Sequence, residues 1–398
     1  MNPLLQPAGG RRLSDGSDAL AELSFDWAPA ERIAFSVTPR VQISRPDEGE
    51  DAEDVFLQNL QANLALGNLI LSVGRDYVAW AQGVHGGLAF GGNARGLDRV
   101  ELRTDRPFAF PGFLGFLGSG AASLFVSRLE EDRDIPHSYL VGYRLGLRPG
   151  RAFEFGMMAL VHSGGEGAPE SSLGDRVLEN IIFLEPFIDA QASNRQLGFD
   201  IRIRFPGERG AELYSEYLLE DPPANLSVYK KWLWHDVGWL VGLWFPRLDE
   251  AGRTDLRLEG RHTGLRLGRH TQFTSGMSLD GQLLGDGLGP DGNGAYLTLG
   301  TLLGSDLRLE LHGAAERRSR DRYRFGPPPG GGPNRFERIE SFAKEDRARV
   351  LATLWYRPVD RPISLRVRGG FEWADDFAFV AGDRRRAFSL WVTGFWRP

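Results

Sequence analysis

The chain has 398 residues, of which 41% are hydrophobic and 25% charged, and its formal net charge is −6. This composition is too apolar for a disordered chain, and the mild negative charge argues against nucleic-acid binding, which requires a basic face. The chain has no cysteine, which excludes disulfides and thiolate chemistry, and no apolar run reaches the ~18 residues of a transmembrane helix.

The first residues, MNPLLQPAGGRRLSDGSDAL, contain no apolar core segment of the kind found in signal peptides. We expect residues 1–18 to be a disordered or partly ordered N-terminal segment. We expect residues 19–398 to form one domain, whose class follows from the pattern of the later stretches.

Apolar and polar residues alternate in many stretches along the rest of the chain. Examples in chain order are LVGYRLGLR (140–148), GFDIRIRF (198–205), TDLRLEGRH (254–262), SDLRLELHGA (305–314), ISLRVRGGFE (363–372) and AFSLWVTGFW (387–396). Successive side chains of a strand point to opposite faces, so each stretch has one apolar and one charged face. Roughly 16 to 18 such stretches occur, mostly near the ~9–11 residues that a tilted strand needs to cross a bilayer.

The connections between these stretches alternate in length. Short connections fall at 148–151, 206–210, 247–253, 303–306 and 357–362, and long ones fall between them at 163–193, 220–231, 264–291 and 321–337. Outer-membrane barrels combine short periplasmic turns with longer extracellular loops, whereas a Greek-key sandwich has no reason to separate loop lengths in this way. The sequence therefore predicts an all-β fold, a transmembrane antiparallel up-and-down β-barrel of about 16–18 strands in the outer membrane of a Gram-negative bacterium.

In such a barrel the apolar face meets lipid and the charged face lines the lumen. The predicted luminal charges are Arg202, Arg204, Arg257, Glu259, Arg308, Glu310, Arg366 and Arg368. Arginine–carboxylate pairs among them would stiffen the wall, and we favour this interpretation for each residue. The alternative is an anion-recognising channel, because guanidinium groups bind carboxylates bidentately.

Aromatic residues gather near the ends of the later strands, where their amphipathic rings would suit the membrane interfaces. The residues concerned are Trp232, Trp234, Trp239, Trp244, Trp355, Tyr356, Trp391 and Trp396.

No motif indicates catalysis, a metal or a cofactor. The glycine-rich stretch GFLGFLGSG (112–120) lacks the Lys-Ser/Thr of a P-loop and is expected to be a turn. The seven histidines show no metal-binding spacing, and no Gly-x-Ser-x-Gly nucleophile elbow is present. We expect a protein that is not an enzyme.

The middle of the chain resembles the Wzi family of outer-membrane capsule assembly proteins. In LALGNLILSVGRDYVAWAQGVHGGLAFGGNARGLDRVEL, the residues that carry the resemblance are Gly74, Arg75, Trp80, Gly83, Asn93 and Ala94. For four of them, Gly74, Arg75, Trp80 and Asn93, we expect a structural role. RPFAFPGFLGFLG, FEFGMMALVHSGGEG and AELYSEYLLED are similar in order and spacing, so the resemblance covers about residues 50–320.

The resemblance implies an 18-stranded barrel that binds capsular polysaccharide, acts as a lectin and helps to attach the polysaccharide to the cell surface. Two features depart from the family. The family's Trp-Gly-Pro-Gly segment is WAQG here (80–83), and residues 1–18 are too few for the helical plug that precedes the family's barrel. The expected partners are surface polysaccharide, outer-membrane lipid and the barrel assembly machinery, with the protein itself a monomer.

Candidate contacts to polysaccharide lie in two long loops that offer aromatic rings and arginines. They are Tyr229 and Trp232 in one loop and Arg317, Arg318, Arg320, Arg322 and Arg324 in the other. Two alternatives stay open at this point, a diffusion porin for anionic sugars and a barrel lipase. Whether the lumen is open or plugged would separate the porin from the glycan-binding barrel.

Overall fold

The computed structural model describes residues 9–11, 13–168, 174, 193–207, 209–220, 236–327, 330–332, 335–340 and 343–396. Almost all regular structure in these ranges is β-strand, because the sequence alternates with a period of two. None of the helices in these ranges is long and apolar enough to cross a membrane.

The strands of the first half are β1 (Ser17–Glu22), β2 (Phe25–Ala30), β3 (Ile33–Arg45), β4 (Ala52–Leu66), β5 (Leu69–Asp76), β6 (Leu97–Thr104), β7 (Phe108–Ala109), β8 (Ser119–Arg128), β9 (Tyr139–Arg148), β10 (Phe153–Ser163) and β11 (Ser193–Phe205). Those of the second half are β12 (Ala211–Glu220), β13 (Val237–Phe245), β14 (Thr254–Thr263), β15 (Ser278–Leu279), β16 (Gln282–Leu283), β17 (Gly292–Leu302), β18 (Leu307–Arg318), β19 (Arg322–Gly326), β20 (Arg335–Ile339), β21 (Glu345–Tyr356), β22 (Ile363–Asp375) and β23 (Arg384–Trp396). Two short 3-10 helices are η1 (Gly112–Leu117) and η3 (Phe377–Phe379).

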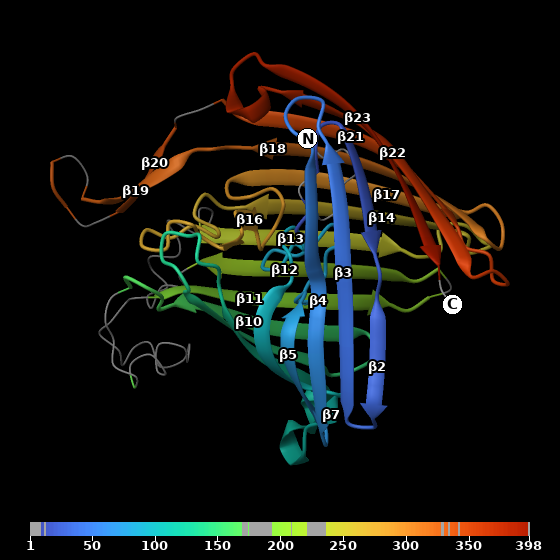
Figure 1. Ribbon diagram of the computed structural model, residues 1–398. Helices are drawn as coiled ribbons and strands as arrows, with labels where there is room; N and C mark the ends of the chain where they lie inside the picture. The colour runs from blue at the N-terminus through green and yellow to red at the C-terminus, as the bar shows by residue number, and fades with distance from the viewer. Residues whose placement is uncertain are drawn as a thin grey trace.

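Nineteen of these strands form one antiparallel sheet in which, apart from two places, each strand pairs with the next strand along the chain (Figure 1). Strands β1 and β2 lie end to end along β3, and β6 and β7 lie end to end along β8, so the 19 strands occupy 17 positions. This meander confirms the predicted all-β, up-and-down architecture. Within the described residues β23 forms no register with β1 or β2, and these strands are the two edges of the sheet.

The sheet is apolar outside and charged inside. On β23, Phe388, Leu390 and Val392 are 58–61% exposed, as expected for side chains that face lipid. Thr353 and Glu372, on the other face of the neighbouring strands, are at most 1% exposed. The predicted orientation of the alternating stretches is therefore confirmed.

The connections between strands are mostly short at one end of the sheet and mostly long at the other. One side, here the short-turn side, carries connections such as 149–152, 206–210, 303–306 and 357–362. The other, here the long-loop side, carries the connections from β5 to β6, β10 to β11, β14 to β17 and β18 to β21, including the projecting β19–β20 hairpin (Figure 1). The predicted alternation of turns and loops is confirmed, with one long connection (105–118, containing η1) on the short-turn side.

The prediction that the strand aromatics lie at the membrane interfaces is wrong for Trp391, which lies opposite the luminal Arg368 in the register of β22 and β23, and for Trp244 and Trp355. The guanidinium of the luminal Arg257 lies 4.7 Å from the ring centre of Trp244, and that of Arg366 lies 4.8 Å from Trp355. Both tryptophans occupy inward positions of their strands, where a cation–π contact orients a luminal arginine. Trp373 and Trp396, at outward positions, are 41% and 69% exposed.

Candidate functional site

The connection between β5 and β6, residues 77–96, turns into the lumen, and we call it the inserted loop. It reaches strands on several sides of the lumen. The Trp80 ring lies 5.3 Å from Phe125 of β8, and the His85 ring lies 5.0 Å from Tyr296 of β17. At its far end, Gly9 and Gly10 of the N-terminal segment donate backbone hydrogen bonds to the carbonyls of Gly92 and Asn93.

Glu216 of β12 holds the centre of the inserted loop. Its carboxylate is 1% exposed and accepts hydrogen bonds from the backbone N–H groups of Gln82, Gly83 (3.1 Å) and Leu88 (2.8 Å). A buried carboxylate is costly unless hydrogen bonds satisfy its oxygens, and here the loop backbone supplies them. The same bonds satisfy N–H groups of a segment that has no strand partner.

Glu259 of β14 is a second buried carboxylate that binds the inserted loop. Its carboxylate accepts hydrogen bonds from Val84 N (2.7 Å), from the Tyr214 hydroxyl (2.6 Å) and from Arg261 (2.7 Å). Arg261 also pairs with Asp286 of the β14–β17 loop at 2.8 Å. Since both side chains of the Arg261–Glu259 pair are 1% exposed, these charges are compensated by one another and not by water.

Gln82 lies at the position of the proline in the family's Trp-Gly-Pro-Gly segment, which is WAQG here. Its side-chain nitrogen donates to Asp200 of β11 at 2.7 Å, and its oxygen accepts from the guanidinium of Arg202 at 2.7 and 3.0 Å. A proline at this position could make none of these bonds. The substitution adds a polar bridge between the inserted loop and the wall.

Apolar contacts complete the packing of the inserted loop. Trp80, Leu88 and Phe90 are 2–7% exposed and belong to one core with residues of β8, β9, β10, β12 and β13 and of the β14–β17 loop. Trp80 meets Phe90 edge-on at 5.5 Å. The β14–β17 loop folds over the inserted loop from the long-loop side, where Leu284 O accepts a hydrogen bond from Gly91 N at 2.7 Å.

Four residues of the family resemblance support this arrangement. Gly74 has φ +135°, and a Cβ atom there would lie 1.9 Å from the carbonyl oxygen of Leu60, so no other residue fits. Arg75 pairs with Asp98 through two 2.8 Å hydrogen bonds across the base of the loop. Trp80 lies in the apolar core, and Asn93 donates to Gly285 O at 2.9 Å.

Some of the predicted luminal charges form ion pairs with nearby carboxylates of the wall. Arg202 and Arg204 contact Glu212 at 2.6 and 3.2 Å. Arg308 lies between Asp255 and Glu310, with 2.9 Å to the latter. Arg368 donates to the Thr353 hydroxyl at 3.1 Å, whereas Arg257 and Arg366 stack on aromatic rings.

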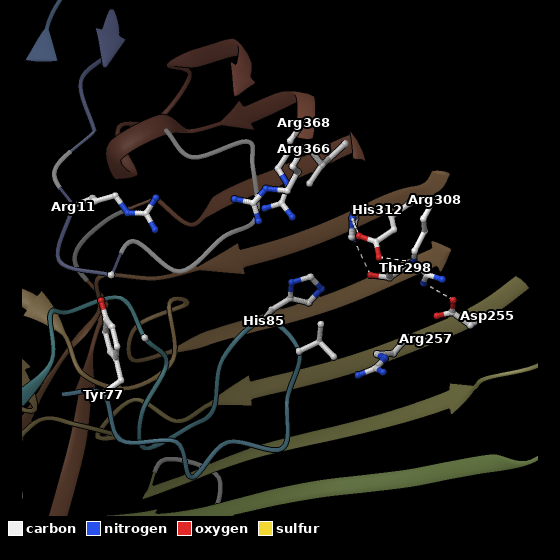
Figure 2. A pocket seen from close by; sticks show the side chains of 15 residues that line it. Arg11, Tyr77, His85, Asp255, Arg257, Thr298, Arg308, His312, Arg366 and Arg368 are labelled. Atoms are coloured by element: carbon white, nitrogen blue, oxygen red, sulfur yellow. Dashed lines mark hydrogen bonds and ion pairs between the residues drawn. The ribbon is translucent and has the colours of Figure 1, made fainter. Parts of the chain in front are cut away.

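A cavity of about 610 Å³ lies between the inserted loop and the short-turn side (Figure 2). Val84 and His85 of the loop and Gly9 and Arg11 of the N-terminal segment form part of its lining. The wall contributes Asp255, Arg257, Thr298, Arg308, Glu310, His312, Leu351, Arg366 and Arg368. The sequence predicted several of these as luminal, but it did not predict that they line one cavity together with the inserted loop and the N-terminal segment.

The predicted arginine cluster lies on the long-loop side. Arg317 pairs with Asp346 at 2.7 Å, and Arg324 pairs with Glu337 across the β19–β20 hairpin. Arg318 donates to Leu288 O at 3.0 Å. Arg320 lies 4.9 Å from the Phe379 ring, and both it and Arg322 are exposed. Tyr229 and Trp232, the other candidates, lie outside the described residues, as do Trp234 and most of the residues between β10 and β11.

The long loops are fastened to one another by side chains that sequence reasoning missed. Asp134, between β8 and β9, accepts a hydrogen bond from Thr274 Oγ1 at 2.9 Å, and its backbone N–H donates to Ser275 Oγ at 3.0 Å. Burial raises the pKa of Asp134, but hydrogen bonds from Ser275 and Thr274 outweigh that effect and lower the pKa to about 2. Arg133 donates to Gly276 O and Ser278 O.

In the described ranges, no group of three or more histidines and carboxylates is placed to hold a metal ion. On the long-loop side the described residues include exposed guanidinium groups, among them those of Arg320 and Arg322, next to loops that cover the inserted loop. Such groups can bind carboxylates and stack on flat apolar faces, chemistry that suits recognition more than bond making.

Comparisons with known proteins agree with this architecture. A model of the family described as capsule assembly protein Wzi matches residues 2–387. A solved structure of Wzi from Escherichia coli, described as an outer membrane protein involved in group 1 capsule assembly and a carbohydrate-binding β-barrel, is 17% identical with a TM-score of 0.69. The match covers 98% of this chain and 80% of that one. No curated protein matches the chain.

Two solved structures of proteins from Pseudomonas aeruginosa are also similar in fold. The outer membrane protein OprD is 11% identical with a TM-score of 0.51, and the match covers 95% of this chain and 87% of that one. OccD3 (OpdP) is 10% identical with a TM-score of 0.53, covering 95% and 86%.

Proposed function

Because the chain belongs to the capsule assembly protein Wzi family, we propose that it is an outer-membrane barrel that binds surface polysaccharide and helps to hold it at the cell surface. The binding surface consists of the long loops, and no reaction is catalysed. The similar Escherichia coli structure is described as carbohydrate-binding, which supports this proposal.

The position of the inserted loop is the observation that carries the proposal. A diffusion porin needs an open path for its solutes, and 16–18-stranded porins keep an aqueous channel. Here residues 77–96 cross the lumen and are bound by Glu216 and Glu259, which are 1% and 5% exposed. A filled lumen under a broad loop surface favours a binding protein over the porin alternative.

Within that surface, we assign Arg320, Arg322 and Arg324 to polysaccharide contact. Arg320 and Arg322 are exposed, and the Arg324–Glu337 pair is open to solvent, with side chains 56% and 40% exposed. Contacts of exposed charges are individually weak, so affinity would come from several sugars bound at once. Binding of an acidic glycan would therefore weaken strongly with salt.

The test is retention of capsule by intact cells. Deleting the gene should shift polysaccharide from the cell-associated to the released fraction, and the triple variant R320S/R322S/R324S should do so in part. A matched control removes three exposed arginines scattered along the long-loop side, R45S/R128S/R384S. Unchanged retention in the deletion strain would overturn the function, whereas unchanged retention in the folded triple variant alone would move the site to another loop.

A further inference from the structure

The cavity between the inserted loop and the short-turn side carries an excess of positive charge. Its lining sets five guanidinium groups against two carboxylates, those of Arg11, Arg257, Arg308, Arg366 and Arg368 against Asp255 and Glu310. Both carboxylates contact the same arginine, Arg308. The lining of this space therefore carries more positive than negative charge.

Arg257 and Arg366 carry most of this argument, because within the described residues neither forms an ion pair with a carboxylate. Arg257 lies over Trp244 and, at 5.9 Å, over Tyr214. Arg366 lies over Trp355 and, at 5.5 Å, over Phe395, and its Nε is buried with no hydrogen-bond acceptor. The rings hold both planar groups in place, so they are preorganised for an anion at little cost in side-chain entropy.

The cavity faces the short-turn side. Asp255 and Arg308 are the second residues of β14 and β18, and Arg366 is the fourth residue of β22, so all three lie near the short turns. On the opposite side the lining comes from Val84 and His85 of the inserted loop (Figure 2). A ligand would therefore enter past the short turns.

We propose that this cavity binds a saccharide that carries a carboxylate, such as a uronic acid, with the carboxylate against Arg257 and Arg366. Guanidinium groups bind carboxylates bidentately, and a volume of about 610 Å³ is in the range of small-molecule sites, well above the size of an inorganic ion. Thr298, Tyr77 and His85 supply hydrogen-bonding groups for sugar hydroxyls. The choice of a sugar rests on the proposed function, whereas the preference for an anion rests on the charges alone.

The test is calorimetric titration of the detergent-solubilised full-length protein at low ionic strength with three probes: glucuronic acid, glucose and inorganic phosphate. We expect glucuronic acid to bind and glucose to bind at least tenfold more weakly. The variant R257Q/R366Q should lose at least tenfold in affinity for glucuronic acid. The variant R257K/R366K keeps the positive charge but loses the planar guanidinium group, so its affinity for glucuronic acid should lie between those of the wild type and R257Q/R366Q.

The matched control is R253Q/R361Q, which removes two exposed arginines from turns on the same side and should bind as the wild type does. Equal affinity for glucuronic acid and glucose, or wild-type affinity in both the Gln and the Lys variants, would overturn the proposal. Binding of phosphate without glucuronic acid would also overturn it, because the site would then be an anion site but no sugar site.

Failure here is distinguishable from failure of the proposed function. R320S/R322S/R324S should retain binding of glucuronic acid, since those residues lie on the long-loop side. Normal capsule retention in the deletion strain would refute the proposed function while leaving the titration of the cavity interpretable. Loss of cavity binding in R257Q/R366Q with normal capsule retention would support the cavity as a second, separate site.

Discussion

Glu216 is a single buried carboxylate that accepts hydrogen bonds from three backbone N–H groups of the inserted loop. Glu216→Ala leaves these donors without an acceptor, and each buried unsatisfied donor costs about 1–3 kcal/mol. For three donors we therefore expect a loss of at least about 3 kcal/mol in the free energy of unfolding, measured by urea titration in lipid vesicles. Glu216→Gln keeps an acceptor and should lose less; an equal loss in both variants would mean that the negative charge, and not hydrogen bonding, holds the loop.

Leu311 lies near the middle of β18 and is 44% exposed on the outer face. Leu311→Arg would place a charge among lipid tails and should cost about 2–4 kcal/mol. The same substitution at Leu303, in the short turn before β18, should cost about 0–1 kcal/mol, because its charge can reach water. Urea midpoints in vesicles measure both, and equal costs would contradict the orientation of the sheet.

At the level of single elements, Asp134 joins two long loops in a pH-dependent way. Its folded-state pKa of about 2 lies below the ~3.9 of an unfolded aspartate. The contact therefore contributes stability above about pH 4 and loses it as the pH falls through 2. Hydrogen exchange in residues 264–291 should increase over this window in the wild type and in Asp132→Asn, but should change little in Asp134→Asn, which is already weakened.

The long loops and the short turns should face opposite compartments. A protease site inserted at Gly330, between β19 and β20, should be cut in intact cells, because long loops of outer-membrane barrels lie outside. The same site at Gly304, between β17 and β18, should be cut only after the outer membrane is opened. Cleavage in intact cells at Gly304 alone would invert the topology.

The strands could be predicted because alternation is a local property, visible within ten residues such as 305–314. The inward position of Trp355 could not be predicted from its ring chemistry; it follows from the register in which Trp355 lies opposite Arg308 and Arg366. The hydrogen-bond partners of Glu216 could not be predicted from the sequence either, because the N–H groups that it binds lie 128–134 residues away in the chain.

At the scale of the whole molecule, the sequence predicted a barrel but left open whether its lumen is filled. That answer depends on the path of residues 77–96, which have neither helical nor strand periodicity, and on buried charges contributed by β11, β12 and β14. The cationic cavity depends on the same loop, because Val84 and His85 of that loop form part of its lining. The inserted loop thus lies between the long-loop side, which we propose binds polysaccharide, and the cavity, which we propose binds a single acidic sugar.

Conductance in a planar lipid bilayer tests this account most directly, comparing the wild type with a variant in which residues 80–92 are replaced by a short Gly-Ser linker. The wild type should show no steady current above that of the bare bilayer, because the inserted loop fills the lumen. The variant should show stepwise openings, since removing the loop leaves only the polar wall. A steady wild-type current that the replacement leaves unchanged would contradict a filled lumen and favour the porin.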